Sequence, residues 1–244
     1  MRRPFEGTWN VVRFNWPRYV AGILVVAITF TIATTGQTRL PMLFWCAGFL
    51  ALVMLVLPLI ASYRIYDRSG LYRMVWLDGL APSVVLNMTA GFDESSSILA
   101  SRCATAKLVV VDFFDPTKHT EPSIARARKA YPPYPGTELT FGHVLPLPDS
   151  SVDLSVGFLA LHEIREHRDR VKLLGEVRRV LAPQGHLVIT EHLRDLPNAI
   201  AFSIGVLHFH SDKTWTRAFQ EAHFRLVRQH RTTPFITTYV LRPA

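Results

Sequence analysis

The chain has 244 residues, 49% of them hydrophobic, and its 27 lysine and arginine residues against 19 acidic ones give a formal net charge of +8. No basic run interleaved with aromatic residues stands out after residue 82, which argues against nucleic-acid binding. The two cysteines, Cys46 and Cys103, lie in regions of different character, so they predict no disulfide framework and fit a reducing compartment.

Two uncharged apolar runs near the N-terminus, Tyr19 to Thr38 and Leu40 to Tyr63, are divided only by Arg39. Each has the roughly 20 residues that a helix needs to cross a bilayer. They predict a transmembrane helical hairpin over residues 19–63, with a re-entrant or interfacial helix pair as the alternative. A cleaved signal peptide fits poorly, because no small-residue cleavage pattern precedes Arg39 and a second apolar run follows.

Basic residues are concentrated outside the two runs, which places both chain ends in the cytoplasm by the positive-inside rule. We therefore expect a multi-pass protein of the inner (cytoplasmic) membrane whose larger domain lies in the cytoplasm, with a homo-oligomer through the hairpin left open. The flanking arginines are Arg2, Arg3, Arg13 and Arg18 before the first run, and Arg64, Arg68 and Arg73 after the second.

After residue 82, strand-like and helix-like segments alternate, which predicts a parallel sheet with crossover helices. The predicted organisation is an N-terminal basic and aromatic segment (1–18), the hairpin (19–63), a juxtamembrane helix (64–82) and an α/β domain (83–244). The expected strands are 83–88, 107–113, 139–141, 152–158, 186–190, 224–230 and 236–241, and the expected helices are 94–104, 122–130 and 168–181.

Three stretches resemble the class I S-adenosylmethionine-dependent methyltransferases, and within them the lipoquinone and small-molecule branch. They are Leu145–Val156 (LPLPDSSVDLSV), Leu161–Glu163 (LHE) and Glu176–Ile189 (EVRRVLAPQGHLVI). The resemblance covers about residue 66 to the C-terminus. It implies a Rossmann-like seven-stranded sheet that ends in an antiparallel hairpin, with S-adenosylmethionine as the cofactor.

The loop after the first strand departs from the family pattern, in which an acidic residue precedes a Gly-x-Gly-x-Gly turn. Here Asn87 stands at the acidic position, and Gly91 alone remains of the three glycines. Asp93 takes a glycine position, and Thr89 and Ala90 lie between. The resemblance assigns these five residues to cofactor binding, with Asp93 or Glu94 as a replacement for the missing acid.

The second strand keeps its acid, Asp112, where family members bind the ribose hydroxyls. His143 falls where the family usually has an acidic residue near the adenine amine. The resemblance assigns Phe113, Val144 and Phe158 to the same cofactor pocket.

These departures from the family pattern at the cofactor site allow two interpretations. In the first, the pocket still binds S-adenosylmethionine, which Asp112, Gly91 and the intact 145–161 stretch favour. In the second, the fold has lost the cofactor and serves as a membrane-tethered scaffold. The degenerate loop also resembles that of the rhodoquinone-forming enzymes, which use the cofactor to deliver an amino group.

Catalytic candidates follow the fourth and fifth strands, because ligands bind at the carboxyl ends of strands in open α/β sheets. His162 could accept a proton near neutral pH and Glu163 could orient it, while Glu191 and His192 end the next strand. The alternative is that these side chains only line the pocket.

The remaining histidines predict no metal site. His192, His208 and His210 could supply imidazole ligands, but their spacing matches no recognised zinc pattern and no cysteine accompanies them. The apolar, aromatic segment 200–210 is better interpreted as a substrate lid or a membrane-facing insertion.

The sequence as a whole predicts a membrane-anchored S-adenosylmethionine-dependent methyltransferase. Its expected acceptor is lipophilic: a quinone, an isoprenoid, a phenol or a lipid headgroup at the cytoplasmic membrane face.

Overall fold

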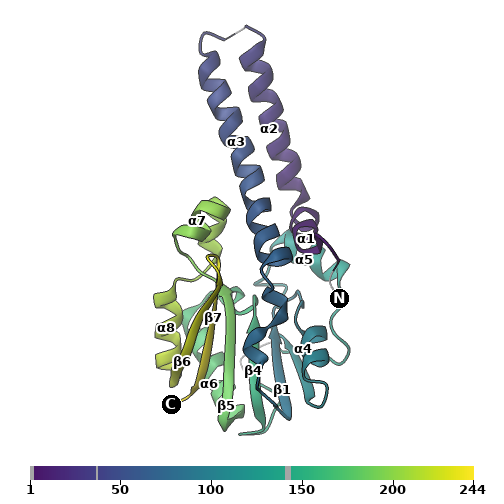
Figure 1. The fold of residues 1–244 in the computed structure, drawn as a ribbon, viewed down its shortest axis with the longest axis vertical. Coiled ribbons are helices and arrows are strands. Elements are labelled where there is room, and N and C mark those ends of the chain that lie inside the picture. Colours follow the sequence, from purple (N-terminus) through teal and green to yellow (C-terminus); the bar gives the residue numbers. More distant parts are fainter. Residues whose placement is uncertain (1–2, 37, 141–143) are drawn as a thin grey trace.

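The computed structural model describes residues 3–36, 38–140 and 144–244, and shows a helical hairpin standing on an α/β domain (Figure 1). The domain contains one seven-stranded sheet of order β3-β2-β1-β4-β5-β7-β6. Only β7 runs antiparallel to its neighbours β5 and β6. The predicted parallel sheet with a C-terminal antiparallel hairpin is confirmed. The strands are β1 (Val84–Thr89), β2 (Lys107–Asp112), β3 (Glu138–Leu139), β4 (Val152–Phe158), β5 (Leu181–His192), β6 (Phe224–Thr233) and β7 (Ile236–Pro243).

The helices agree with the predicted ones in type, and their ends differ by a few residues. The predicted strand 139–141 corresponds to β3, but Phe141 lies outside the described residues. The α-helices are α1 (Glu6–Phe14), α2 (Trp16–Thr34), α3 (Pro41–Ser62), α4 (Ser96–Arg102), α5 (Pro122–Ala130), α6 (His167–Val180), α7 (Leu196–Phe202) and α8 (Asp212–Glu221). The shorter helical turns are η1 (Tyr63–Arg68), η2 (Leu71–Arg73), η3 (Val75–Leu77), η4 (Leu161–Glu163) and η5 (Ser203–His208).

The two faces of the sheet bury different partners, because successive side chains of a strand point to opposite faces. One face, with Leu86 and Ile189, packs against the apolar sides of α6 and α8, where Trp215 is fully buried. The other face, with Val85 and Val188, packs against α4 and residues 61–77.

Segment 64–82 is not the single juxtamembrane helix that the sequence predicts. It begins as η1, continues through η2 and η3, and is interrupted at Gly70 and Gly79, which both have positive φ. Ile65 and Met74 are buried against the sheet, with 0% and 1% exposure. Burial of these apolar residues outweighs helical continuity, so the segment belongs to the core of the α/β domain.

Helices α2 and α3 form the antiparallel hairpin and correspond to the two predicted apolar runs (Figure 1). Both are long and apolar enough to cross a membrane by length and composition, and most of their side chains are exposed. Gly22 faces Leu55, and Gly48 faces Phe30, so the small residues let the two helices approach closely.

Helix α1 lies across the base of the hairpin, against η1 and α5 (Figure 1). The Asp67 carboxylate accepts hydrogen bonds from the backbone N–H groups of Gly7 and Thr8, at 2.9 and 3.0 Å. Tyr131 donates from its hydroxyl to Asn10 Oδ1 at 3.0 Å. These contacts hold α1 over the carboxyl ends of the parallel strands, where it forms part of the cavity described next.

Candidate active site

A cavity of about 250 Å³ lies at the carboxyl ends of β1, β4 and β5, as expected for a ligand site in an open α/β sheet. Ala90, Phe158 and His192 line it from the strand ends. Phe14 of α1 and Phe209, which follows η5, line it as well. The cavity is mostly apolar, with histidine and carboxylate groups at one side.

Asn87, which stands at the position of the family acid, is fully buried in β1. Its amide nitrogen donates to the hydroxyls of Ser95 and Ser96 at 2.8 and 2.7 Å. Asn87 therefore joins β1 to the start of α4, and it lines none of the cavities described here.

Asp93 begins the turn into α4, and its two carboxylate oxygens have different surroundings. Oδ1 accepts hydrogen bonds from the backbone N–H groups of Ser95 and Ser96, both at 2.9 Å, which is the arrangement of a helix cap. Oδ2 is buried and has no hydrogen-bond partner within the described part of the chain. A buried carboxylate oxygen without a donor is costly, and it marks a place where a ligand could donate.

Asp112 ends β2 as predicted, and its carboxylate is already engaged. Oδ1 accepts from the backbone N–H groups of Gly91 and Phe114 at 2.8 and 3.0 Å, and Oδ2 pairs with Arg128 of α5 at 2.5 Å. The Arg128 guanidinium also lies 4.2 Å from the centre of the Phe114 ring. The cavity beside these groups holds only about 10 Å³. Arg128 thus occupies the side of Asp112 that the resemblance assigns to a ribose.

The predicted cofactor residues divide between cavities. Thr89 and Gly91 line the small cavity beside Asp112, together with Asp93, whereas Phe113 lines a different one. Val144 is 72% exposed and lies away from every cavity described here. His143 lies outside the described residues.

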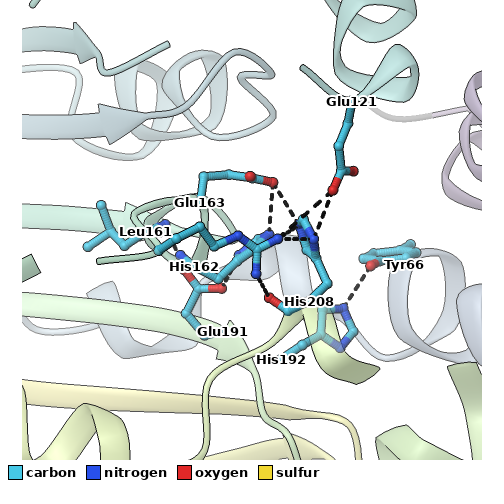
Figure 2. Close-up of polar contacts among 9 residues, drawn as sticks. Tyr66, Glu121, Leu161, His162, Glu163, Glu191, His192 and His208 are labelled. Carbon is cyan, nitrogen blue, oxygen red and sulfur yellow. Dashed lines mark hydrogen bonds and ion pairs between the residues drawn. The ribbon is translucent and has the colours of Figure 1, made fainter. Parts of the chain in front are cut away.

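His162, in the turn η4 after β4, is held by the buried carboxylate of Glu191 (Figure 2). His162 Nδ1 lies 2.6 Å from Glu191 Oε2, while Oε1 accepts from the backbone N–H of Leu161 at 2.8 Å. Burial alone would lower the pKa of His162, but the carboxylates of Glu191 and Glu163 outweigh it and raise the pKa to about 10.

Glu163 extends this arrangement to a second imidazole, that of His208 in η5 (Figure 2). Glu163 Oε1 lies 3.4 Å from His162 Nε2 and 3.0 Å from His208 Nε2. Burial alone would raise the pKa of Glu163, but the hydrogen bonds from the two histidines lower it. The other nitrogen of His208 lies 3.1 Å from the carboxylate of Glu121.

His192, at the end of β5, has the opposite character. Its Nδ1 lies 3.1 Å from Asn198 Oδ1, and its Nε2 lies 2.8 Å from the Tyr66 hydroxyl. Because the amide oxygen only accepts, Nδ1 carries the proton and Nε2 accepts from Tyr66. Burial lowers the pKa of His192 to about 4, so the ring is neutral at pH 7. It stacks on Phe209 at 4.7 Å between ring centres.

The structure therefore brings together Ala90, Phe158, His162, Glu163 and His192 among the predicted residues. It adds Tyr66, which the sequence pattern did not indicate as a site residue. It also adds α1, whose Phe14 lines the cavity. Phe202 and Phe209 line it too, and they belong to segment 200–210, which the sequence predicts as a substrate lid or a membrane-facing insertion.

A second, larger cavity of about 800 Å³ lies at the base of the hairpin. Tyr19 of α2, Leu55 and Pro58 of α3, and Ile204 of η5 line it. The two cavities adjoin, since both are lined by Val11, Asn15, Ser123, Phe202 and Phe209.

Comparison with known proteins agrees with the fold and with the class of the domain. Residues 86–189 match the family model of the methyltransferase domain. The chain is 33% identical to the demethylmenaquinone methyltransferase of Thermus thermophilus over 118 residues. The aligned region covers 46% of this chain and 48% of that protein. The chain thus spans about half the length of this curated relative.

Solved structures show the same fold at low sequence identity. A SAM-dependent methyltransferase from Aquifex aeolicus superposes with a TM-score of 0.55 at 16% identity, over 75% of this chain and 92% of that one. Human N-acetylserotonin methyltransferase in complex with SAM gives a TM-score of 0.54 at 13% identity, over 96% of this chain and 70% of that one. The domain match agrees with the predicted class of methyltransferase, and the solved structures show the same fold.

Proposed function

We propose that the chain is an S-adenosylmethionine-dependent methyltransferase, anchored to the membrane by α2 and α3, that acts on a lipophilic acceptor. The observation that carries this proposal is that the two cavities adjoin. The strand-end cavity shares five lining residues with the 800 Å³ cavity, which lies at the base of the apolar hairpin. We expect an acceptor dissolved in the bilayer to enter at the hairpin base and to reach the strand ends from there.

The residues present fit the cofactor, with one obstacle. In favour are the acid at the end of β2, Asp112, and the unpartnered buried Oδ2 of Asp93 on the loop after β1. Asp112 would accept from the ribose hydroxyls and Asp93 from the amino group. The obstacle is Arg128, which must leave Asp112 before a ribose can use it. When bound, the cofactor supplies an electrophilic methyl group on a sulfonium.

The acceptor side of the cavity offers a proton acceptor and aromatic walls. His192 is neutral at pH 7, and its Nε2 accepts a hydrogen bond from Tyr66. The proton of an acceptor hydroxyl would therefore pass to the Tyr66 oxygen while the Tyr66 proton moves to Nε2. Phe158 and Phe209 provide flat apolar surfaces for a ring-shaped acceptor. The Thermus relative is named for demethylmenaquinone, which favours a quinone-type acceptor here.

The surface around the second cavity suits a bilayer. Helix α7 packs against α3, and the large apolar side chains of α7 and η5 point outward. Such a cluster beside two apolar helices is typical of membrane contact. Its members are Leu196 (72% exposed), Ile200 (61%), Ile204 (83%) and Leu207 (64%).

The orientation of the hairpin is tested by cysteine labelling in intact cells, with Cys46 and Cys103 replaced by serine. We expect a Thr38→Cys variant to react with a membrane-impermeant maleimide from outside the cytoplasm. Cysteines at residues 10 and 240 should react only after the membrane is opened. Labelling of position 38 only from the cytoplasmic side would disprove the hairpin topology.

The activity is tested in two steps with the full chain in detergent. Calorimetry should show binding of S-adenosylmethionine. Incubation with the methyl-labelled cofactor and demethylated quinols or membrane lipid extract should then transfer label to an apolar product. A His192→Gln variant should keep cofactor binding and lose transfer. Binding without transfer to any lipophilic fraction would contradict the proposed acceptor class.

A second candidate function, a non-catalytic tethered scaffold, is favoured by one specific observation. Asp112 is fully occupied by Arg128 and two backbone N–H groups, and only about 10 Å³ is open beside it. Absence of any cofactor binding by the wild-type chain would support the scaffold and remove the methyltransferase.

A further inference from the structure

Three nitrogen and oxygen atoms converge at one side of the strand-end cavity. They are His162 Nε2, Glu163 Oε1 and His208 Nε2, from two segments about 45 residues apart (Figure 2). These ligand atoms all lie within 4.8 Å of one another. Glu163 Oε1 is 3.4 Å from the first imidazole nitrogen and 3.0 Å from the second.

The spacing suits a metal ion. Ligands about 2.0–2.1 Å from a tetrahedral zinc ion lie about 3.3 Å from one another. The two measured separations, 3.4 and 3.0 Å, bracket that value. Two imidazoles and a carboxylate are also a ligand set that zinc and other first-row transition ions use with one position left open.

Each imidazole has a carboxylate at its other nitrogen. His162 Nδ1 lies 2.6 Å from Glu191 Oε2, and His208 Nδ1 lies 3.1 Å from Glu121 Oε1. Metal-binding histidines almost always have such a partner, because it fixes the orientation of the ring. Since the carboxylates raise the pKa of His162 to about 10, binding of an ion must release the proton from Nε2. Glu191 is fully buried and is itself held by two backbone N–H groups, so the His162 ring is fixed in orientation.

The competing explanation is a network of charged hydrogen bonds, because an imidazolium donates from both ring nitrogens and can face two carboxylates. Arg165 belongs to that network: its guanidinium donates to the backbone oxygen of His208 and lies against the ring nitrogens. The Arg165 side chain is 41% exposed, so it can turn to solvent when an ion binds. The pair of His167 with Glu221 at 2.8 Å has no third ligand among the described residues.

We propose that His162, Glu163 and His208 bind one divalent first-row transition-metal ion, with zinc as the best geometric match. Glu191 and Glu121 act as positioning residues for the two imidazoles. Because His162 and Glu163 also line the strand-end cavity, an oxygen atom of a ligand there can reach the open coordination position. Bound at that position, an oxygen would be polarised by the ion. The binding itself does not depend on methyl transfer.

The test is metal binding by the full chain in detergent, without an affinity tag and after treatment with a chelator. Titration with Zn²⁺ by calorimetry should show one equivalent bound. Substitution by Co²⁺ should give the visible absorption of a low-symmetry site with imidazole ligands. No binding by the wild-type chain, or more than one equivalent with no preferred site, would overturn the proposal.

Variants localise the site. His208 is partly buried in the short turn η5, with 23% of its side chain exposed. His208→Ala should lower affinity for Zn²⁺ at least tenfold, as should Glu163→Gln. Glu191→Gln should lower it roughly ten- to a hundredfold while leaving one equivalent bound, as expected for a positioning residue. The matched control His167→Ala removes a histidine with its own carboxylate partner outside the cluster and should bind as the wild type does. Equal affinity in His208→Ala and wild-type protein would disprove the assignment, whatever becomes of the buried variants.

Discussion

Two pairs of strands end at the same edge of the sheet, β1 with β2 and β4 with β5. They differ in whether their terminal polar side chains are bonded within the protein or line a cavity. At β1 and β2, Asn87 is bonded to two serines, and Asp112 is bonded to Arg128 and two backbone N–H groups. The open space there is about 10 Å³. At β4 and β5, His162 and His192 line the cavity of about 250 Å³, which adjoins the cavity of about 800 Å³.

The difference bears on how ligands could bind. A ligand that uses Asp112 must replace an internal cation, which costs part of its binding energy. A ligand at the ends of β4 and β5 enters a space that polar groups already face. We therefore expect the acceptor side to be preformed and the cofactor side to depend on movement of Arg128, and the following predictions test this contrast.

The largest effect is expected on stability, from Asp112→Ala. Removal of the carboxylate leaves Arg128, only 23% exposed, and two backbone N–H groups without their acceptor. The free energy of unfolding should fall by roughly 3 kcal/mol, measured by denaturant titration in detergent. The control Asp149→Ala removes the 77% exposed partner of Arg179 and should cost less than about 1 kcal/mol. An equal fall in the free energy of unfolding in both variants would show that the contacts of Asp112 stabilise the fold no more than an exposed ion pair does.

A smaller effect is expected from the pH dependence conferred by His192. Burial lowers its pKa from 6.5 to about 4, so the unfolded chain takes up a proton first as the pH falls. The stability due to neutral His192 is present above pH 6.5 and is lost as the pH falls toward 4, by up to roughly 3 kcal/mol. The charge of His162 also lowers the pKa of His192, and the charge of Asp195 raises it. Both groups remain in the His192→Gln variant described next.

A His192→Gln variant should therefore lose less stability between pH 6.5 and 4 than the wild type. The surface variant His167→Gln serves as the control and should keep the wild-type pH profile. Parallel profiles for His192→Gln and wild type would mean that His192 is not buried in neutral form.

The sheet could be predicted from the sequence because its strands are short apolar runs bounded by turn residues, as Val84–Met88 and Val152–Phe158 show. The hairpin could be predicted because its two runs lack charge over their whole length. The division of segment 64–82 into short helical turns could not be predicted from the sequence. Its cause is the burial of Ile65 and Met74 against a sheet whose strands come later in the chain.

The sequence predicted the strand-end residues of the candidate site and the segment 200–210, but not their distant partners. His162, His192 and Phe158 directly follow or end a strand, so position along the chain places them at the cavity. Their partners come from distant segments: Tyr66 lies 126 residues before His192, and Arg128 comes from a crossover helix that no short motif ties to Asp112. Local pattern carries no information about such pairs.

A further prediction tests Arg128 as the obstacle on the cofactor side. Arg128→Gln removes the ion pair with Asp112 and should tighten binding of S-adenosylmethionine about tenfold, or about 1.4 kcal/mol, by calorimetry. The control Lys129→Gln removes the same charge from an exposed neighbouring position and should leave affinity unchanged. Weaker binding by Arg128→Gln would mean that the arginine holds the ligand instead of excluding it.

The smallest effect separates cofactor binding from helix capping at Asp93. Its Oδ1 caps α4 through the N–H groups of Ser95 and Ser96, while its buried Oδ2 has no partner in the described part of the chain. Asp93→Asn keeps an oxygen for the cap, because asparagine caps helices about as well as aspartate, and places an N–H₂ group at Oδ2. Stability should change by less than about 0.5 kcal/mol, whereas affinity for S-adenosylmethionine should fall roughly three- to tenfold, because the negative charge that attracts the amino group is lost. If both affinity and stability stay the same, Asp93 is only a cap and does not replace the missing acid at position 87.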